Sequence, residues 1–449
     1  MRPLDRFVRI VYLLGHTSGD AMTPTDTPES SGNESKPYKR RPRYAGTHPK
    51  RYEDKYKEHD IESHPDMAAH LRAKGITPAG SHVSVLVEEA LACLRPGPGE
   101  IVVDGTLGHG GHARRFLEAL GPSGRLIGLD VDGVQLERTG RRLTAEYPNV
   151  SLHRGNFAGI AGVLGKEGLS ACDIIFVDLG ISSMQIDDPQ RGMSYKHDGP
   201  LDMRMDDRLK RTAANLLAAL TEREIAEALR DLADEPDHAA IARRIVAERA
   251  IRPITRTVQL VDLVFEVRGL TRQVWRHQQR SSKSPPPHPA ARTFQALRML
   301  VNDELGCLRE LLRIAPYCLR PGGRIGVISF HSGEDRLVKQ SFREGLHTGV
   351  YESAAEDPIT PTHEERRQNP RSAPAKLRWA AKPQTSDHRP CARGRRTSTG
   401  RQSLTDTRWL AALVHHAAVD GVDTSSDTCG DYQRMYRRLG CNDAADGVE

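Results

Sequence analysis

The sequence predicts a doubly wound α/β sheet that is interrupted by a helical segment, and three observations support this prediction. Short apolar, β-branched runs alternate with amphipathic helical patterns from about residue 82 onward. The first run, Ile101–Asp104, leads into a loop with four glycines within seven residues. About 145 residues separate the fourth run, which ends at Asp178, from the fifth, which begins at Gly323. Because one crossover between parallel strands needs far less chain, the intervening segment is expected to form a helical subdomain.

Composition and charge restrict the class of protein. The chain has 449 residues and is 37% hydrophobic, which suffices for a core but is low for the whole length. Residues 1–78 are expected to form a disordered basic extension and residues 383–449 a polar one. The seven cysteines include no C-x-x-C pair, and no apolar run reaches the ~18 residues that span a bilayer. We therefore expect a cytoplasmic protein without a metal site or a membrane segment, and its net charge of +6 suits a polyanionic partner.

The first part of the α/β domain is expected at residues 79–211. It begins with an amphipathic helix at about Val85–Leu94, which a Pro-Gly-Pro-Gly run ends. The predicted strands are Ile101–Asp104, Arg125–Leu129, Val150–Leu152 and Asp173–Asp178, with helices at His112–Leu120 and from Asp130 to about Tyr147. The fourth strand is apolar throughout, as expected for a strand covered on both faces. Ligands of such a sheet bind at the carboxyl ends of its strands.

The long gap carries helical patterns. Apolar spacing predicts helices at Thr221–Leu232, Asp237–Ala250 and Thr257–Val267, and the threonines at 221 and 257 suit helix N-caps. We place an inserted helical subdomain at residues 212–288. The second part of the α/β domain follows at residues 289–382, with a helix at Thr293–Leu319 and a fifth strand at Gly323–Phe330. A short helix is expected at Trp409–Ala418.

The glycine-rich loop after the first strand indicates a cofactor site. Glycine allows positive φ and lets a ligand approach backbone N–H groups at the start of a helix. Gly108–Ala113 also satisfies the dinucleotide fingerprint, and Asp130, roughly twenty residues on, suits a ribose in either NAD(P) or S-adenosylmethionine. Asp104 at the strand end suits a cationic amino-acid moiety, and His112 is bulky within the fingerprint. These two residues favour S-adenosylmethionine over the dinucleotide.

The segment after the fourth strand carries the candidate chemistry. Asp178–Pro189, Arg191–Tyr195 and Asp198–Asp206 mix carboxylates, hydroxyls and glycines. They follow directly on the carboxyl end of the fourth strand, where a substrate enters a doubly wound sheet. This position favours a functional loop over an ordinary surface loop.

From His82 to about Ala380 the sequence resembles the RsmH/MraW family, S-adenosylmethionine-dependent methyltransferases that modify N4 of a cytidine in the decoding region of 16S ribosomal RNA. The matching segments are Val103–His112, Asp178–Ser183, Asp198–Asp206, Arg292–Arg298 with Val301–Leu305, and Ile328–Ser332 with Glu334–Arg336. The resemblance implies a Rossmann-like methyltransferase sheet and an inserted substrate-recognition subdomain. It also implies S-adenosylmethionine as the cofactor and 16S rRNA in the small ribosomal subunit as the partner.

Carried over by position, the resemblance implies a set of cofactor contacts. They come from Gly110, Gly111, His112, Asp130, Phe157, Asp178 and Gln185. The residues themselves already favour most of these positions, whereas Gln185 rests on the resemblance alone. The sequence departs from the family pattern at His109, where arginine is usual, at Gly333, which interrupts a usual His-Ser-Leu-Glu-Asp, and over an atypical Arg268–Pro287 segment.

The reaction requires an acceptor that hydrogen-bonds the cytosine amine and takes its proton. We expect Asp178 to be this catalytic group, with Ser182, Ser183 or a loop carbonyl as alternatives; Asp178 could instead cap the next turn or hold the methionine amine. His331 and Ser332 either line the pocket or fill the top of the sheet.

The target base must be unpaired or flipped out, so cations of this region are candidates for holding RNA phosphates. These cations are Arg191, Arg204, Arg292, Arg298 and Arg336. Each could equally be the partner in an ordinary ion pair. Two other functions stay open at this point, namely a methyltransferase for another amine in RNA, DNA or protein, and a catalytically silent RNA-binding ribosome assembly factor. The sequence does not indicate an oligomeric state.

Overall fold

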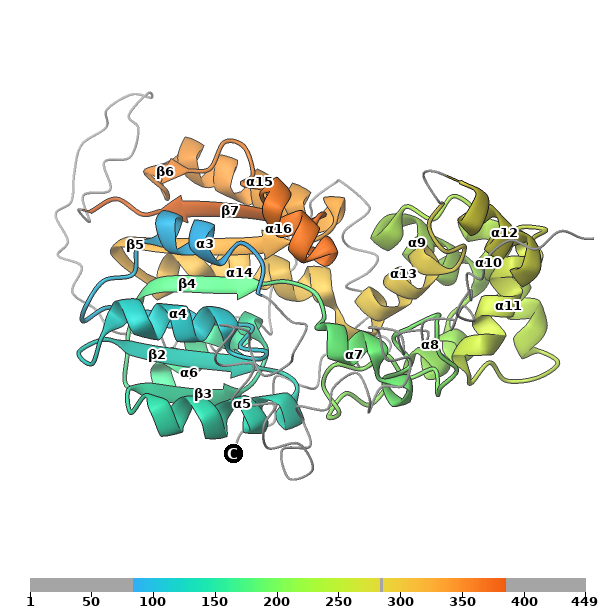
Figure 1. Cartoon of the computed structure of the whole chain (residues 1–449), viewed down its shortest axis with the longest axis horizontal. Helices are drawn as coiled ribbons and strands as arrows, with labels where there is room; N and C mark the ends of the chain where they lie inside the picture. Colours follow the sequence, from blue (N-terminus) through green and yellow to red (C-terminus); the bar gives the residue numbers. More distant parts are fainter. Residues whose placement is uncertain (1–83, 283–285, 385–449) are drawn as a thin grey trace, which may run out of the picture. The chain divides into compact units, whose positions relative to one another are not determined.

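The computed structural model describes residues 84–282 and 286–384. The predicted extension at residues 1–78, nearly all of the one at 383–449 and the predicted helix Trp409–Ala418 lie outside the described residues. Within the described part, seven strands form one sheet in the order β3-β2-β1-β4-β5-β7-β6 (Figure 1). No helix of this part is both long and apolar enough to cross a membrane.

Five parallel strands form the body of the sheet. They are β1 Ile101–Asp104, β2 Arg125–Asp130, β3 Val150–Arg154, β4 Cys172–Asp178 and β5 Leu319–Ser329. The chain moves outward from β1 to β2 and β3, returns to the other side of β1 as β4, and continues to β5. This reversal of direction confirms the predicted doubly wound α/β sheet. It also places the carboxyl ends of β2, β1 and β4 beside one another.

Two antiparallel strands complete the sheet, and the sequence analysis did not predict them. β7 Lys376–Ala381 pairs with β5, and the two-residue β6 Ser353–Ala354 pairs with the far side of β7. β5 thus has a hydrogen-bonded neighbour on both sides, and the short β6 lies at the edge. An edge strand of two residues presents few unpaired backbone groups to other chains.

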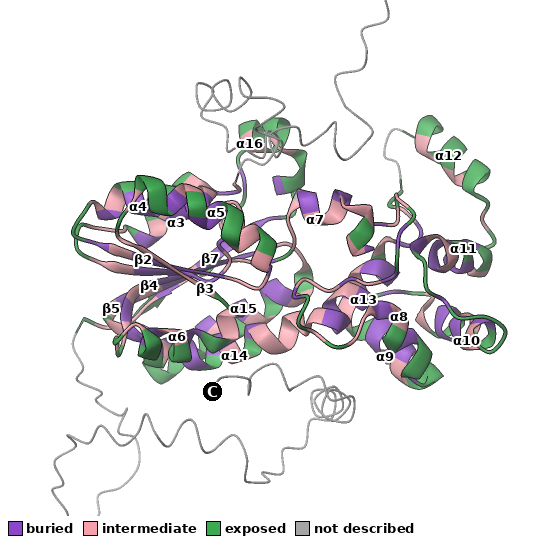
Figure 2. Ribbon diagram, turned by 90° about the horizontal axis from the view of Figure 1, so that it is seen from below, coloured by how far each residue is buried: buried purple, intermediate pink, exposed green. Residues whose placement is uncertain are grey.

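Helices cover both faces of the sheet (Figure 2). One face carries α3 Val87–Leu94, α4 Gly111–Leu120 and α5 Gly133–Glu146, and the other carries α6 Ile160–Lys166, α14 Glu304–Cys318 and α15 Ser332–Thr348. Alternate residues of a strand point to opposite faces, so Val102 joins the apolar cluster under α4 while Val103 joins the cluster under α14. The sheet is therefore buried on both sides, which explains its apolar strands.

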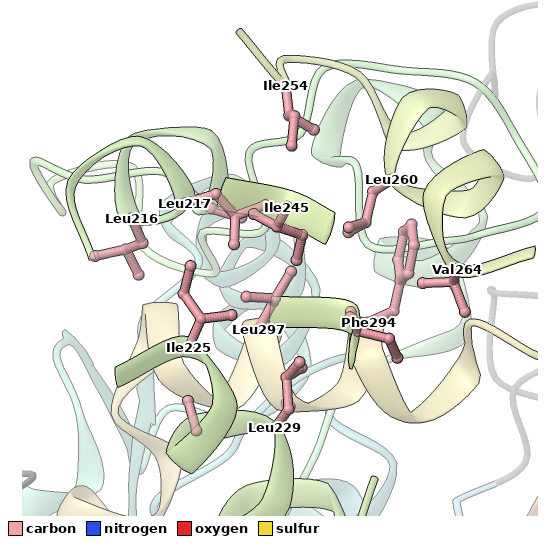
Figure 3. Packing of buried hydrophobic residues seen from close by; sticks show 14 of the residues in the cluster. Leu216, Leu217, Ile225, Leu229, Ile245, Ile254, Leu260, Val264, Phe294 and Leu297 are labelled. Carbon is pink, nitrogen blue, oxygen red and sulfur yellow. The ribbon is translucent and has the colours of Figure 1, made fainter. Parts of the chain in front are cut away.

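The long segment between β4 and β5 forms a helical cluster. Its helices are α8 Ala213–Ala219, α9 Glu222–Ala233, α10 His238–Arg249, α11 Thr257–Val267, α12 Arg272–Ser281 and α13 Ala291–Asn302. Leucine, isoleucine, valine and phenylalanine side chains from this segment pack into one core, which Figure 3 shows from close by. The core includes Phe294 and Leu297 of α13. The cluster therefore extends past residue 288, where we had placed the end of the insertion.

The single helix predicted at Thr293–Leu319 is wrong. Two helices, α13 and α14, occupy this range, and Asp303 separates them in the left-handed conformation with φ of 47°. The two helices serve different cores, because Phe294 packs with the helical cluster while Leu308 packs beneath the sheet. The apolar spacing continues through the break, so periodicity alone does not reveal it. The remaining short elements are α7 Ser183–Asp187, α16 His363–Gln368, and the 3-10 turns η2 Phe157–Gly159, η3 Pro189–Arg191 and η4 Pro370–Ser372.

Truncation of Leu297 to alanine is expected to destabilise the helical cluster by about 2–5 kcal/mol, because Leu297 is fully enclosed and its removal leaves a cavity. Urea denaturation followed by circular dichroism measures this loss. Ile251→Ala removes similar apolar volume from a side chain that is 82% exposed and should change stability by less than about 0.5 kcal/mol. Equal effects of the two substitutions would show that α13 is not part of the cluster core.

Candidate active site

Three aspartates end three neighbouring strands at one edge of the sheet. Asp104 is the last residue of β1, Asp130 of β2 and Asp178 of β4. Because β1 pairs in parallel with both β2 and β4, these residues share the edge at which the glycine-rich loop begins. The structure thus brings together the carboxyl groups that the sequence analysis chose separately.

Asp130 organises the glycine-rich loop. Its Oδ2 accepts a hydrogen bond from the Gly108 backbone N–H at 2.7 Å, and its Oδ1 accepts one from the Asp132 N–H at 2.9 Å. The Thr139 hydroxyl of α5 donates to the Gly108 carbonyl at 2.6 Å. The loop is therefore held from both sides, which keeps its backbone in place for a ligand.

Glycine is required at two positions of this loop. Gly110 has φ of 75°, and a Cβ there would lie 2.9 Å from Cγ2 of Thr139. A Cβ on Gly105 would lie 2.8 Å from Cβ of Phe157. Phe157, one of the predicted cofactor contacts, therefore packs against the start of the loop. Gly110 is the N-cap of α4 and Gly111 its first residue, so backbone N–H groups are available at this helix terminus.

Asp178 has a buried carboxylate oxygen without a hydrogen-bond donor among the described residues. That atom is Oδ1, while Oδ2 lies 3.9 Å from Nδ1 of His112. The backbone N–H of Asp178 donates to the Thr106 hydroxyl at 2.6 Å, so the carboxyl group is not needed to satisfy its own turn. A buried carboxylate oxygen that lacks a donor lowers the stability of a folded protein, and such atoms are typical of catalytic and ligand-binding sites.

His112 is held in place by contacts on two sides. Its Nε2 lies 2.9 Å from the Val85 carbonyl oxygen, and its ring centroid lies 4.6 Å from that of Phe176. Since a carbonyl oxygen accepts a hydrogen bond, Nε2 is the donor. Nδ1 is then the atom that faces Asp178. His112 therefore links the start of α4 to the end of β4.

Burial and neighbouring carboxylates raise the pKa of all three carboxyl groups. Burial raises the pKa of Asp104 to about 7, and the neighbouring Asp130 adds to the shift. Burial likewise raises the pKa of Asp130 to about 6. The pKa of Asp178 rises well above its usual value because of burial, Asp104 and Glu334. Such shifts occur where carboxylates gather without a compensating cation, so the site favours a positively charged ligand.

The short helix α7 connects the loop after β4 to the loop after β2. The Ser182 hydroxyl accepts a hydrogen bond from the Gln185 backbone N–H at 3.2 Å and thereby caps α7. The Gln185 side chain accepts from the Ser182 N–H at 3.0 Å and donates to Oδ2 of Asp132 at 3.1 Å. Arg191 contacts the same Asp132 oxygen at 2.6 Å. Gln185 thus lies at the edge where Asp130 ends β2.

Asp132 is a site residue that the sequence analysis missed. It caps α5 by accepting a hydrogen bond from the Gln135 N–H at 3.2 Å. It also binds the side chains of Gln185 and Arg191 from the loop after β4. An aspartate one residue before a helix start is a recognisable cap signal in a sequence. Its role as a link between two loops depends on contacts more than fifty residues apart and has no local signal.

A buried polar network lies behind Asp178. Glu334 accepts a hydrogen bond from the Phe330 N–H at 2.9 Å, and Arg298 and Glu304 form a two-pronged ion pair at 2.7 and 2.9 Å. His331 caps α15 through Nδ1, which accepts from the Glu334 N–H at 3.4 Å. His331 therefore sits at the top of β5, beside the site but engaged in a helix cap.

Most of the arginines proposed as phosphate contacts have partners within the chain. Arg191 pairs with Asp132, Arg204 with Asp202, and Arg298 with Glu304, while Arg292 donates to the Asp234 carbonyl oxygen. Arg336 is exposed and makes no ion pair among the described residues. Likewise, no group of three or more histidine, cysteine, aspartate or glutamate side chains in the described ranges could hold a metal ion.

Comparisons with known proteins give one consistent result. A model of the MraW methylase family matches residues 79–383. The chain is 40% identical over 360 residues to the ribosomal RNA small subunit methyltransferase H 1 of Lachnoclostridium phytofermentans, an alignment that covers 79% of this chain and 96% of that protein. It is 47% identical over 270 residues to the ribosomal RNA small subunit methyltransferase H of Syntrophotalea carbinolica, covering 60% and 82% of the two chains.

The raised pKa values of the site predict a dependence of stability on pH. The unfolded chain has an ordinary carboxyl at residue 104, whereas the folded chain keeps this carboxyl protonated up to about pH 7. Between roughly pH 4 and pH 7 the folded state therefore binds more protons, and the contribution of Asp104 to the unfolding free energy falls as the pH rises. Asp104→Asn should be more stable than the wild type at pH 8, by about 1 kcal/mol or more, and the gain should shrink toward pH 5. Urea unfolding at several pH values measures it; a variant less stable at pH 8 would contradict the prediction.

Proposed function

The chain belongs to the MraW methylase family, and from this premise we propose that it methylates N4 of a cytidine in the decoding region of 16S ribosomal RNA, with S-adenosylmethionine as the cofactor. The observation that carries the proposal is the buried Oδ1 of Asp178 at the carboxyl end of β4, which has no hydrogen-bond donor in the described part of the chain. It lies at the same sheet edge as the glycine-rich loop and offers an acceptor for an amine. The names of the relatives support small-subunit ribosomal RNA as the substrate.

The described residues fit S-adenosylmethionine. Its sulfonium and ammonium groups are cations, and three carboxyl groups with raised pKa values meet here, none of them paired with a lysine or arginine of the described ranges. Asp130 already accepts two backbone hydrogen bonds, and a carboxylate has further lone pairs for ribose hydroxyls. The residues proposed to hold the cofactor are Gly110, Gly111, His112, Asp130, Phe157, Asp178 and Gln185, together with Asp104, which the sequence analysis already favoured, and Asp132, which binds Gln185. When bound, the cofactor would supply an electrophilic methyl carbon, and its sulfur would keep the electron pair of the broken carbon–sulfur bond and leave as a neutral thioether.

The chain must orient the amine and remove one proton. The lone pair of cytosine N4 is delocalised into the ring, so an acceptor that hydrogen-bonds the amino group makes this pair more available. Asp178 Oδ1 is proposed as that acceptor, and its carboxylate takes the proton that N4 loses when the N–C bond forms. Burial raises the pKa of Asp178, which makes its carboxylate a stronger base than an ordinary aspartate. Ser182 is engaged as the cap of α7 and is the second candidate.

Transfer of tritium from labelled S-adenosylmethionine to purified small ribosomal subunits, followed by nucleoside analysis, tests the proposal. Label in N4-methylcytidine supports it. Label in another nucleoside, or in protein, would assign the enzyme to a different amine. Binding of the subunit without any transfer would identify an RNA-binding assembly factor and would overturn the proposed reaction.

Asp178→Asn should lower turnover by about 100-fold or more, because the amide is nearly isosteric but cannot accept the proton. Cofactor affinity, measured by calorimetry, should fall by only a few-fold, because the asparagine oxygen can still accept a hydrogen bond from the cofactor. Ser182→Ala is the matched comparison, since it removes a neighbouring hydroxyl and a helix cap but leaves the carboxyl group. If Ser182→Ala abolished turnover and Asp178→Asn did not, the acceptor role would pass to Ser182. If Asp178→Asn lost cofactor binding, Asp178 would be a cofactor ligand only.

A further inference from the structure

Helix α12 presents to solvent two arginines, Arg276 and Arg280, that have no acidic partner among the described residues. Its sequence over Arg272–Ser281 contains three arginines and one histidine and no aspartate or glutamate. Trp275 and Gln279 are the half-buried positions and lie one turn apart, so they mark the inner face of the helix. Arg276, His277 and Arg280 are exposed. The outer face of α12 is therefore basic.

Most other arginines of the helical cluster have an acidic partner, and the arginines at the end of α12 differ from them in this respect. On α9, α10 and the segments that flank α11, the pairs are Arg223–Glu227, Arg230–Asp231, Arg243–Glu222, Arg244–Glu248, Arg252–Glu248 and Arg256–Asp198. Arginines then recur every fourth residue from 268 to 280. Arg268 pairs with Glu235 and Asp237, and Arg272 pairs with Asp262.

The last two arginines of this series break the pattern. Arg276 and Arg280 have no acidic partner among the described residues, although acidic partners serve the arginines one and two turns earlier. Their like charges lie about 6 Å apart along the helix axis and repel each other, which weakens an isolated helix slightly. Binding of an external polyanion would neutralise these two charges and explain why the helix carries them.

Aromatic contacts hold α12 against the loop that follows β4. Trp275 meets Phe265 of α11 edge to face at 6.3 Å and His288 at 4.7 Å. His288 in turn stacks on Tyr195 with ring centroids 4.2 Å apart and an angle of 14°. Tyr195 belongs to the Arg191–Tyr195 segment of the candidate substrate loop. The basic helix is thus connected by packed rings to the loop that leaves the active site.

The electrostatics of this junction agree with a basic surface. Burial lowers the pKa of His288 to about 4, and the neighbouring cations Arg272, Lys196 and Arg268 lower it further. His288 is therefore neutral at physiological pH and does not add to the charge. Lys196 is exposed, forms no ion pair in the described part of the chain, and extends the positive potential from α12 to the substrate loop.

We propose that Lys196, Arg276, His277 and Arg280, here called the α12 surface, bind backbone phosphates of the RNA outside the nucleotide that is methylated. This inference rests on the proposed function. Guanidinium groups bind phosphates through paired hydrogen bonds, and such contacts position an RNA without reading its sequence. A lipid surface fits poorly, because α12 turns Trp275 inward and exposes Val274 as its one large apolar side chain.

The double substitution Arg276→Gln and Arg280→Gln in the full chain tests the α12 surface. Affinity for a transcript of the 16S decoding region is measured as a function of salt by fluorescence anisotropy. Two lost phosphate contacts should raise Kd about 10-fold near 0.15 M salt and reduce the slope of log affinity against log salt by about 1.4. KM for RNA should rise similarly, whereas kcat at saturating RNA and the Kd for S-adenosylmethionine should stay within about twofold.

Arg223→Gln with Arg243→Gln is the matched control. It removes the same charge from exposed positions of the same helical cluster, but both arginines have acidic partners. An unchanged salt slope in the α12 variant, or an equal effect of the control, would overturn the proposal. Displacement of the transcript by poly-L-glutamate as effectively as by RNA competitor would assign the surface to an acidic protein instead. If the wild type bound RNA through α12 but transferred no methyl group to cytidine, the proposed function would fail and the α12 surface would stand.

Discussion

Parallel strands end at a common edge, and in this protein three adjacent strands end there on aspartate. Burial of Asp104, Asp130 and Asp178 beside one another is unfavourable in the free protein, because their charges repel and water is largely excluded. The rest of the site is arranged around this constraint. Asp130 accepts a hydrogen bond from Gly108 of the glycine-rich loop, whereas Oδ1 of Asp178 has no donor among the described residues. The site is therefore built to be stabilised by a cationic ligand.

The parts of the fold that local patterns encode were predictable. The strands that became β1 to β5, the glycine-rich loop and the helices α9 to α11 all follow from apolar spacing, glycine and cap residues. The antiparallel strand β7 and the break at Asp303 were not. β7 is recognisable only through its pairing with β5, some fifty residues earlier, and Asp303 interrupts a helical pattern that stays apolar on both sides. In the site, the neighbours of Asp178 follow from strand order, but the link from Gln185 to Asp132 needed the three-dimensional structure.

The sequence analysis was least successful in predicting which arginines are available to bind RNA. Arg204, Arg292 and Arg298 belong to motifs of the family and looked available for RNA, yet each has a partner inside the chain. Ion pairs of this kind orient loops. Arg204 pairs with Asp202 within one loop, and the Met205 N–H of the same loop donates a hydrogen bond to Oδ1 of Asn302 at 2.7 Å. Whether an arginine is free depends on which acids folding brings near it. The structure therefore directs attention away from Arg204, Arg292 and Arg298 and toward α12, where Arg276 and Arg280 have no acidic partner among the described residues.

The position of β7 has a consequence for how the protein is made. A chain leaves the ribosome from its N-terminus, and the helical cluster draws its core from residues 201–301, so everything that cluster needs is synthesised early. The sheet is completed later, because β7 (Lys376–Ala381) lies between β5 and β6 and is synthesised after the helical cluster. Until that segment emerges, one long side of β5 exposes unpaired backbone groups to any passing strand. The sheet that carries the candidate site is thus the last part of the described fold to gain all of its strands, and until then the open side of β5 is where another chain can pair.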